Sequence, residues 1–317
     1  MAESTNTLAG LVQMNDANLA DLNVSNLLQD TPLLRELFAQ PASEGGTLHK
    51  YLRETVAAGG AFRDVNTGIL NAAGIEELVT VTCKYFDAGF FRDVAIADGF
   101  KKGRAAYMAK ETMKALKNAF VSMEKQILQD TTADANGFSG FPAQTSVDAL
   151  ADAMCIGAGG SGGRSVWALR TGADDISVIA GNDGQIKFDF DPEQLQFIQT
   201  VASATPANQR GYFALTAALG GWFATQYGGA YSLGRLANLD GTSGHTLTDA
   251  LMMDLWTLFP ASRKPNLIVM DQTSQSELQK SRTATTESGK EADMPTMFMG
   301  AKIITSDHLN TSESPVS

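Results

Sequence analysis

One long amphipathic helix constrains the fold of this 317-residue chain more than any other feature of its sequence. Apolar residues recur at spacings of three and four between Phe100 and Gln129, which is the repeat of one helix face. At a rise of about 1.5 Å per residue, such a helix is about 45 Å long, which is long for a compact domain. The pattern therefore predicts a helix that serves as a structural backbone. Its apolar stripe consists of Ala105, Ala109, Met113, Leu116, Phe120, Met123 and Ile127.

A row of lysines lies on a neighbouring face of the same predicted helix. Lys110, Lys114 and Lys117 are also three or four residues apart. Such a row is usually a solvated face or pairs with acidic neighbours, although contact with nucleic acid is an alternative. The segment from Asp130 to Glu193 holds 10 acidic residues and only three basic ones, so we expect it to supply the partners, within one subunit or between subunits.

The overall charge and the cysteine count exclude several classes of protein. Lys and Arg number 24 against 35 Asp and Glu, so the formal net charge is −11. Proteins that grip nucleic acid neutralise many phosphates with basic residues, and an acidic surface also repels an anionic membrane. Cys83 and Cys155 are too few for a disulfide framework, which favours a reducing cytoplasm. Met1–Asn6 lack a basic segment followed by an apolar one, so no signal peptide is expected.

One uncharged stretch needs to be tested as a membrane span. No charged residue occurs between Arg210 and Arg235. Glycine disfavours an isolated helix, and a span requires about 20 mostly apolar residues, whereas six glycines interrupt the range Gly211–Gly234. The stretch is therefore interpreted as a pair of buried strands.

From Thr47 to Ala97 the pattern changes to strands that form a hairpin. Glu77–Tyr85 alternates between two faces, and Leu48–Val56 and Ala61–Val65 are also typical of strands. The range Asn66–Gly74 is rich in turn residues and is the expected tip. Neither face is apolar enough to be fully buried, so the hairpin is expected to protrude.

The first 46 residues are expected to form an extended arm. Short leucine-bearing pieces alternate there with Asn and Asp, and their apolar surface is too scattered to fold alone. Thr31–Phe38 is the one predicted helix of this segment, with Thr31 as N-cap and Pro32 at its first position. We expect the arm to lie on other parts of the molecule or on a neighbour, or else to stay disordered.

The rest of the chain mixes short helices and strands. A helix is predicted over Val147–Cys155 with Ser146 as N-cap, and another begins at Thr246 or Thr248 and ends at Pro260. A capping box, Ser274–Glu277, opens a third helix that ends near Arg282. The predicted strands are Ser165–Arg170, Ile176–Ala180, Gln185–Phe190, the strands within Gly211–Leu239, Leu267–Met270 and Met297–Thr305.

A glycine-rich loop at Gly157–Gly163 matches two catalytic or cofactor motifs by letter. Its first part fits the dinucleotide fingerprint, which needs a strand before it and a helix after it. Its second part places Ser161 in a Gly-x-Ser-x-Gly pattern, which marks a hydrolase nucleophile only at a strand-to-helix turn. A helix-like segment precedes the loop and a strand follows it, so the loop is interpreted as flexible and non-catalytic.

The remaining reactive side chains do not form a recognisable constellation. His49, His245 and His308 lie in a strand, a loop and the tail, without the spacing of a metal site. Cys83 shares a strand face with valines, where a buried thiol is inert. Adjacent acidic pairs point apart and do not form an acid–base dyad. We therefore assign no catalytic, cofactor-binding or metal-binding residue and no cofactor.

The order of these parts resembles the major capsid protein of tailed bacteriophages, which has the Hong Kong 97 fold. The resemblance covers residues 47–309 and is carried by several segments in order rather than by a catalytic signature. These segments are Val94–Gly99 leading into the helix that ends Met123–Ile127, then Ser165–Arg170, Gly234–Leu239, Lys264–Met270 and Phe298–Asp307. The chain ends soon after Asp307, so strands that usually close the family's peripheral domain must come from the middle of this chain.

The resemblance implies an α+β fold divided into named parts. These are an N-terminal arm at 1–46, an extended-loop hairpin at 47–97, the spine helix of the peripheral domain at 98–139, an axial-domain segment at 140–164, peripheral-domain strands at 165–241, an axial domain at 242–309 and a C-terminal tail at 310–317.

The resemblance also implies a structural function and a set of partners. Copies of the chain would assemble into hexamers and pentamers of an icosahedral head that encloses double-stranded DNA without sequence-specific binding. The implied partners are other copies of the chain, a portal, a scaffold and, as an option, a decoration protein, and no membrane. The protein would be made in the cytoplasm of a bacterial host and located in the virion capsid.

Two alternatives remain open from the residues alone. An encapsulin, a cellular nanocompartment shell with protein cargo, has the same fold, although the length of the arm and hairpin favours a phage. An α/β hydrolase would use Ser161 as nucleophile, but the strand-turn-helix context is missing from the sequence pattern.

Overall fold

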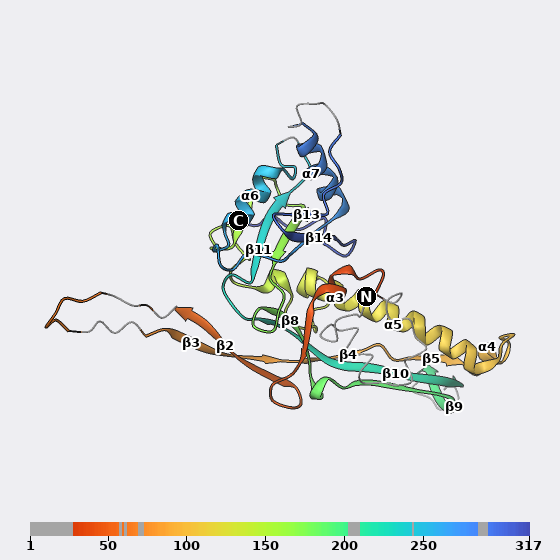
Figure 1. The fold of residues 1–317 in the computed structure, drawn as a ribbon. Coiled ribbons are helices and arrows are strands. Elements are labelled where there is room, and N and C mark those ends of the chain that lie inside the picture. The colour runs from red at the N-terminus through yellow and green to blue at the C-terminus, as the bar shows by residue number, and fades with distance from the viewer. Residues whose placement is uncertain are drawn as a thin grey trace.

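The structure, a computed structural model, describes residues 28–56, 59, 62–68, 73–201, 210–242, 244–284 and 291–317. The described residues form two six-stranded sheets, one two-stranded ribbon and one long helix, so the predicted α+β class is confirmed. Figure 1 shows an upper lobe with α6 and α7, an elongated lower body that ends near α4, and the ribbon β2–β3 projecting from the opposite side.

The lower sheet is built around one very long strand, and we call it the β10 sheet. β10 (Arg210–Tyr227) pairs with β8 (Ile176–Ala180), β4 (Lys84–Asp87), β5 (Phe90–Asp93) and β9 (Ile186–Val201), all antiparallel. β1 (Phe38–Pro41) adds to β8 in parallel. β4 and β5 pair with successive parts of β10. The uncharged stretch thus forms strands, as predicted, but they are β10 and the start of β11 (Leu233–Leu239) in two different sheets, and Phe213 of β10 is exposed rather than buried.

The upper sheet, which we call the β7 sheet, is almost wholly buried. Its strand order is β13-β14-β12-β7-β11-β6. Every residue of its three central strands is buried, because both faces of the sheet are covered. Most of these residues are apolar, and the buried polar ones are Arg164, Ser165, Arg235 and Asn238. The strands are β6 (Cys155–Gly157), β7 (Arg164–Leu169), β11 (Leu233–Leu239), β12 (Leu267–Met270), β13 (Met297–Phe298) and β14 (Ala301–Thr305).

The strands of residues 165–241 are divided between these two sheets. β7 and β11 belong to the β7 sheet, whereas β8, β9 and β10 belong to the β10 sheet. The expectation that this range supplies strands to a single peripheral sheet is therefore wrong. The pairing of β7 with β11 joins segments more than sixty residues apart, and local periodicity carries no signal for such a partner.

The long helix exists, but its buried face differs from the predicted stripe near its N-terminus. α5 (Gly103–Gln129) buries Leu116, Phe120, Met123 and Ile127, as predicted. Ala105 and Ala109 are exposed, and Met108 is buried in their place against the β10 sheet. Alanines occupy several neighbouring positions there, so the apolar pattern alone does not select one face.

A short helix, α4 (Val94–Asp98), precedes α5 where a strand-like pattern was expected, because the Asp93 carboxylate accepts the Ala95 amide at its start.

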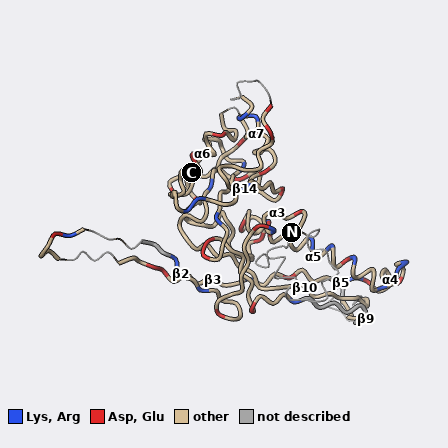
Figure 2. Tube along the Cα trace, in the orientation of Figure 1, with Lys and Arg blue, Asp and Glu red and all other residues tan. Residues whose placement is uncertain are grey.

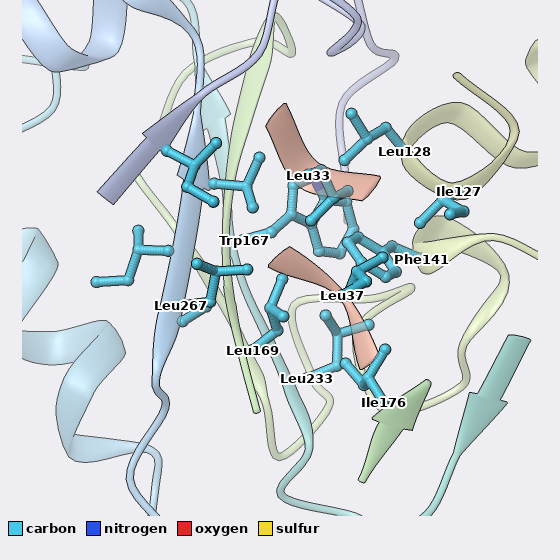
Figure 3. Packing of buried hydrophobic residues seen from close by; sticks show 14 of the residues in the cluster. Leu33, Leu37, Ile127, Leu128, Phe141, Trp167, Leu169, Ile176, Leu233 and Leu267 are labelled. Atoms are coloured by element: carbon cyan, nitrogen blue, oxygen red, sulfur yellow. The ribbon is translucent and has the colours of Figure 1, made fainter. Parts of the chain in front are cut away.

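The main core joins the two sheets, α5 and the first described residues. Trp167 of β7 and Phe141 lie at its centre with ring centroids 5.6 Å apart (Figure 3). Leu33 and Leu37, from and just after α3 (Pro32–Glu36), are fully buried against the same cluster. The predicted helix at Thr31–Phe38 is thus present. The described part of residues 1–46 lies on the rest of the subunit, as one of the expectations for the arm had it, and its leucines complete the packing of the main core.

Three local predictions differ from the structure. Residues 147–154 form turns rather than a helix, and Cys155 begins β6. Asp152 Oδ2 accepts the Ala149 amide and Arg235 donates to the Val147 carbonyl in these turns. Residues 62–65, the described part of a predicted strand, are not in a strand. α7 (Gln272–Ala284) begins before the predicted capping box, because Asp271 accepts the amides of Thr273 and Ser274.

The N-cap residue of α6, Thr248, is expected to stabilise the folded subunit. α6 (Asp249–Thr257) begins after Thr248, whose hydroxyl accepts the Leu251 amide at 3.2 Å. Thr248→Ala is expected to lower the free energy of unfolding by about 1 kcal/mol, because an orphan amide loses its acceptor. Urea denaturation measures the change. Thr257→Ala, at the exposed opposite end of α6, is the control and should change stability by less than about 0.5 kcal/mol. Equal losses in the two variants would contradict this role.

Candidate assembly surfaces

The ribbon β2–β3 projects from the body and exposes apolar side chains. β2 (Leu48–Val56) and β3 (Ile75–Thr82) form the predicted antiparallel hairpin and pair with no other strand among the described residues. Leu52 and Leu78 lie directly opposite each other and are 63% and 60% exposed. A two-stranded ribbon with exposed leucines gains little stability by itself, so these side chains are available to another surface.

The base of this ribbon is fixed rigidly to the β10 sheet. His49 Nε2 lies 2.7 Å from Gln226 Oε1, and the Tyr51 hydroxyl donates to the Tyr227 carbonyl at 3.1 Å. Burial raises the pKa of the Tyr51 hydroxyl, so the hydroxyl stays protonated and remains a donor. The ribbon therefore leaves the body in a defined direction, as Figure 1 shows.

A second apolar surface lies at the far end of the β10 sheet, and we call it the distal patch. It consists of Leu195, Phe197 and Phe213, which the strand register places on one face of the sheet. Phe197 and Phe213 are cross-strand partners with ring centroids 5.6 Å apart, and they are 61% and 59% exposed. The next residue on the same face of β10, Leu215, is buried beneath the helices. The apolar face of the sheet thus continues past the part that the helices cover.

The lysine row is a solvated face with partners inside the subunit. Figure 2 shows basic residues along α5 and around α4. Lys114 pairs with Glu111 at 2.7 Å, and Lys117 pairs with Asp30 at 2.5 Å. Lys110 lies 5.9 Å from the centre of the Phe100 ring. The solvated-face prediction is confirmed, but the intrasubunit partners come from α5 and the first described residues rather than from the segment Asp130–Glu193.

A polar groove of about 630 Å³ separates α5 from β4 and residues 132–138. Amide and hydroxyl side chains of α5 line it, together with Lys84 and Asp134. The Gln126 side-chain amide nitrogen of α5 donates to the Phe138 carbonyl at 2.7 Å and so fixes residues 132–138 to the helix. Ser122 and Thr132 also line the groove, and no hydrogen bond joins either hydroxyl to Lys84, Lys125 or Asp134 in the described structure.

The glycine-rich loop joins two strands. β6 precedes it, where a helix-like segment was expected, and β7 follows it, so no helix N-terminus is available for a phosphate. The backbone amide of Ser161 donates to Asp240 Oδ2 at 3.1 Å, and His245 Nδ1 lies 3.3 Å from the same oxygen. The strand-turn-helix elbow that a hydrolase needs is therefore absent from the described residues at Ser161.

The other reactive side chains lie apart from one another. His49 is in the ribbon base, and His308 Nε2 contacts the Asp30 carbonyl at 2.9 Å. Both thiols are buried, and burial raises the pKa of Cys83 and raises that of Cys155 to about 11, which makes each a poor nucleophile. Within the part of the chain that the structure describes, no three His, Cys, Asp or Glu side chains group as metal ligands, and no helix is long and apolar enough to cross a membrane.

Glu124 is an important residue that the sequence pattern did not reveal. It lies on the buried face of α5 and is fully inaccessible. Its Oε2 accepts the amides of Leu33 and Leu34 at 3.0 and 3.2 Å, and its Oε1 accepts the Ser306 hydroxyl at 2.5 Å. Burial raises the pKa of this carboxyl to about 7, although the hydrogen bonds act in the opposite direction. A glutamate between the apolar positions Phe120, Met123 and Ile127 was the available signal.

Comparison with known proteins identifies the fold. No protein-family model and no curated protein sequence matches this chain. A chain from the near-atomic structure of bacteriophage Epsilon15 is similar over 89% of this chain and 88% of its own length, with 18% identity and a TM-score of 0.62. A chain from the procapsid of bacteriophage JBD30 matches over 89% and 93%, with 12% identity and a TM-score of 0.47.

The likeness to the Epsilon15 chain defines an α+β fold rather than a sequence family. The chain has the Hong Kong 97-type fold, with the long helix, the projecting hairpin and two sheet-bearing lobes. The fold inferred from the order of segments in the sequence is therefore confirmed.

Proposed function

We propose that this chain is the major capsid protein of a tailed bacteriophage and that it self-assembles into hexamers and pentamers of an icosahedral head. The observation that carries the proposal is the fold shared with the Epsilon15 chain over 89% of the sequence. The exposed ribbon and the distal patch support it, because a shell subunit needs surfaces that are completed only by other copies. Its role is structural, with no catalysis.

The parts of the fold take corresponding roles in this proposal. The ribbon β2–β3 is the extended loop, and the β10 sheet with α5 is the peripheral domain. The β7 sheet with α6 and α7 is the axial domain, which meets its copies at the capsomer centre. Its other partners are a scaffold, a portal and an optional decoration protein. The subunit is made in the bacterial cytoplasm and ends in the virion.

The acidic composition is consistent with a shell that encloses DNA but binds it only weakly. Affinity for DNA comes mainly from cations that neutralise phosphates, and this chain has a formal net charge of −11. Lys114 and Lys117 of the lysine row already pair with acidic side chains of the subunit. Packaged DNA is therefore free to slide along the shell during packaging and ejection.

The distal patch supplies a focused test of self-assembly. Phe197→Ser is expected to leave the melting temperature of the isolated subunit within a few degrees of the wild type, because this ring is already mostly exposed. It should reduce the yield of assembled particles by about tenfold or more, because an apolar contact is lost at every copy of the interface. Sedimentation of the expressed protein, with a scaffold supplied if required, measures the particle yield.

The control for this test lies on the same strand. Gln196 is exposed on the opposite face of β9, so Gln196→Ser should assemble like the wild type. Normal particle yield from Phe197→Ser would exclude the distal patch as an assembly surface.

A further inference from the structure

The glycine-rich loop between β6 and β7 cradles the end of the described chain. Gly163 and Glu313 exchange backbone hydrogen bonds of 3.0 and 2.8 Å, so residues 310–317 run beside the loop. A Cβ placed on Gly162, where φ is +119°, would lie 2.5 Å from the Glu313 carbonyl oxygen. Glycine at this position therefore allows the backbone of the tail to approach the loop closely.

A buried arginine binds the one acidic side chain of residues 310–317, Glu313. Arg235 is only 5% exposed, and its Nη2 donates to Glu313 Oε2 at 2.8 Å. Ser165 donates to the same oxygen in a short hydrogen bond. Arg235 also donates to Ser165 Oγ at 3.1 Å and to the Val147 carbonyl at 3.2 Å, and it stacks 4.9 Å from the Trp167 ring centre. These contacts hold the guanidinium in position independently of the tail.

The Asn238 side chain binds the backbone of the tail. Asn238 Nδ2 donates to the Val316 carbonyl at 2.8 Å, and the Val316 amide donates to Asn238 Oδ1 at 2.9 Å. Asn238 has a φ of +61°, a conformation that asparagine tolerates better than most residues and that sets its side chain at the end of β11. The Leu150 amide adds a contact of 3.3 Å to the Ser317 carbonyl.

The tail contributes little side-chain packing in return. Thr311, Ser312, Ser314 and Pro315 are exposed, so the contacts consist of backbone hydrogen bonds and the Glu313 carboxylate. Backbone pairing with one anchored charge is a recurrent way in which proteins bind extended peptides.

We propose that this groove is a peptide-binding site and that residues 311–317 are its resident, exchangeable ligand. It accepts an extended acidic segment in which a glutamate reaches Arg235 and Ser165 and the backbone three residues later pairs with Asn238. The same segment supplied by a second copy of the chain fits the site equally well. The site is complete within one subunit and does not depend on the proposed shell function.

The test uses the full chain with a site-specific protease sequence inserted between the half-buried Asn310 and the exposed Thr311. After cleavage of the folded protein and removal of the freed segment, a labelled Thr311–Ser317 peptide is added and its fluorescence anisotropy is measured. Saturable binding of one peptide per subunit is expected. The Glu313→Gln peptide should bind at least about tenfold more weakly, because Arg235 then lacks its carboxylate. Absence of saturable binding to the folded, cleaved protein, or equal binding of the two peptides, would overturn the proposal.

A second measurement covers the case in which removal of the tail unfolds the subunit. In the uncleaved chain, Gly162→Ala should displace the tail and increase hydrogen exchange at the Glu313 and Val316 amides by about tenfold or more. Gly300→Ala is the matched control, because its φ is +90° but nothing lies within 4 Å of the added Cβ. Unchanged protection in Gly162→Ala, or the same loss in both variants, would refute the role of the loop as the wall of a peptide site.

Discussion

Replacement of residues 54–76 by a two-residue Asn-Gly turn is expected to leave a folded subunit that forms no particles. Arg53 and Glu77 are cross-strand partners, so a two-residue turn can close the shortened ribbon there. The contacts of the ribbon base through His49 and Tyr51 remain. Phe62, Val65 and Ile75, which the variant removes, are exposed and contribute little to the subunit itself, but in a shell they would be buried on neighbours.

Circular dichroism and thermal melting of the isolated subunit, together with sedimentation of the assembly mixture, check this result. The control is a variant in which residues 285–290 are replaced by Gly-Gly. The described residues on either side are close, because the Ala292 amide donates to Thr283 Oγ1 at 3.0 Å. The control should assemble. Particles from the ribbon variant at wild-type yield would exclude the ribbon from assembly.

Glu124→Gln is expected to make the subunit more stable than the wild type at pH 8 and to remove much of its pH dependence between pH 5 and 7. The pKa of this carboxyl is about 7 in the folded chain and about 4.5 unfolded, so the folded state binds more protons between these values. Wild-type stability therefore falls as pH rises through this window, and the fall levels off above pH 7. A difference of about 2.5 pKa units corresponds to about 3 kcal/mol.

Glutamine preserves the shape and an acceptor for the Leu33 and Leu34 amides. Urea denaturation of both proteins at pH 5 and pH 8 measures the expected divergence. Glu111→Gln is a control in which the change in stability at pH 8 is expected to have the opposite sign. Hydrogen bonds from Lys114, and then from Arg92, lower the pKa of the Glu111 carboxyl. This variant should lose stability at pH 8 rather than gain it. Parallel pH profiles for wild type and Glu124→Gln would show that Glu124 does not titrate in this range.

Local elements of the fold could be predicted well where one physical signal dominates. The bounds of β8 and β12 agree with the predicted strands, because each is a short, continuous run of apolar residues that ends at turn residues. The C-terminal half of α5 also agrees, since large apolar residues define its stripe. The N-terminal half does not, because alanines at several positions leave the buried face undetermined.

Long-range relations could not be predicted in the same way. The division of residues 165–241 between two sheets depends on which distant strands pair, as β7 pairs with β11 and β12. Likewise, Leu33 and Leu37 are typical of an arm by composition and enter the core only because α5 and β14 enclose them. The glycine-rich loop could be recognised in the sequence, but its contact with the C-terminal tail could not be predicted. Glu313 of the tail lies about 150 residues after Gly163, and local periodicity carries no signal for such a contact.

Whether a candidate assembly surface could be predicted also depends on how much long-range information it requires. Alternation in β3 predicted a protruding hairpin, because neither face was sufficiently apolar to be buried. The distal patch was not predicted, since Phe197 and Phe213 look like ordinary interior residues of strands until the end of the helical cover is known. Exposure is a property of the whole fold, and sequence periodicity reports only which residues share a face.

Electron cryomicroscopy of the purified, assembled protein tests the central claim most directly. We expect closed icosahedral shells of hexamers and pentamers in which the ribbon β2–β3 of each subunit lies on a neighbouring subunit. A protein that stays monomeric at every concentration and salt condition, with a scaffold supplied, would contradict the proposed function.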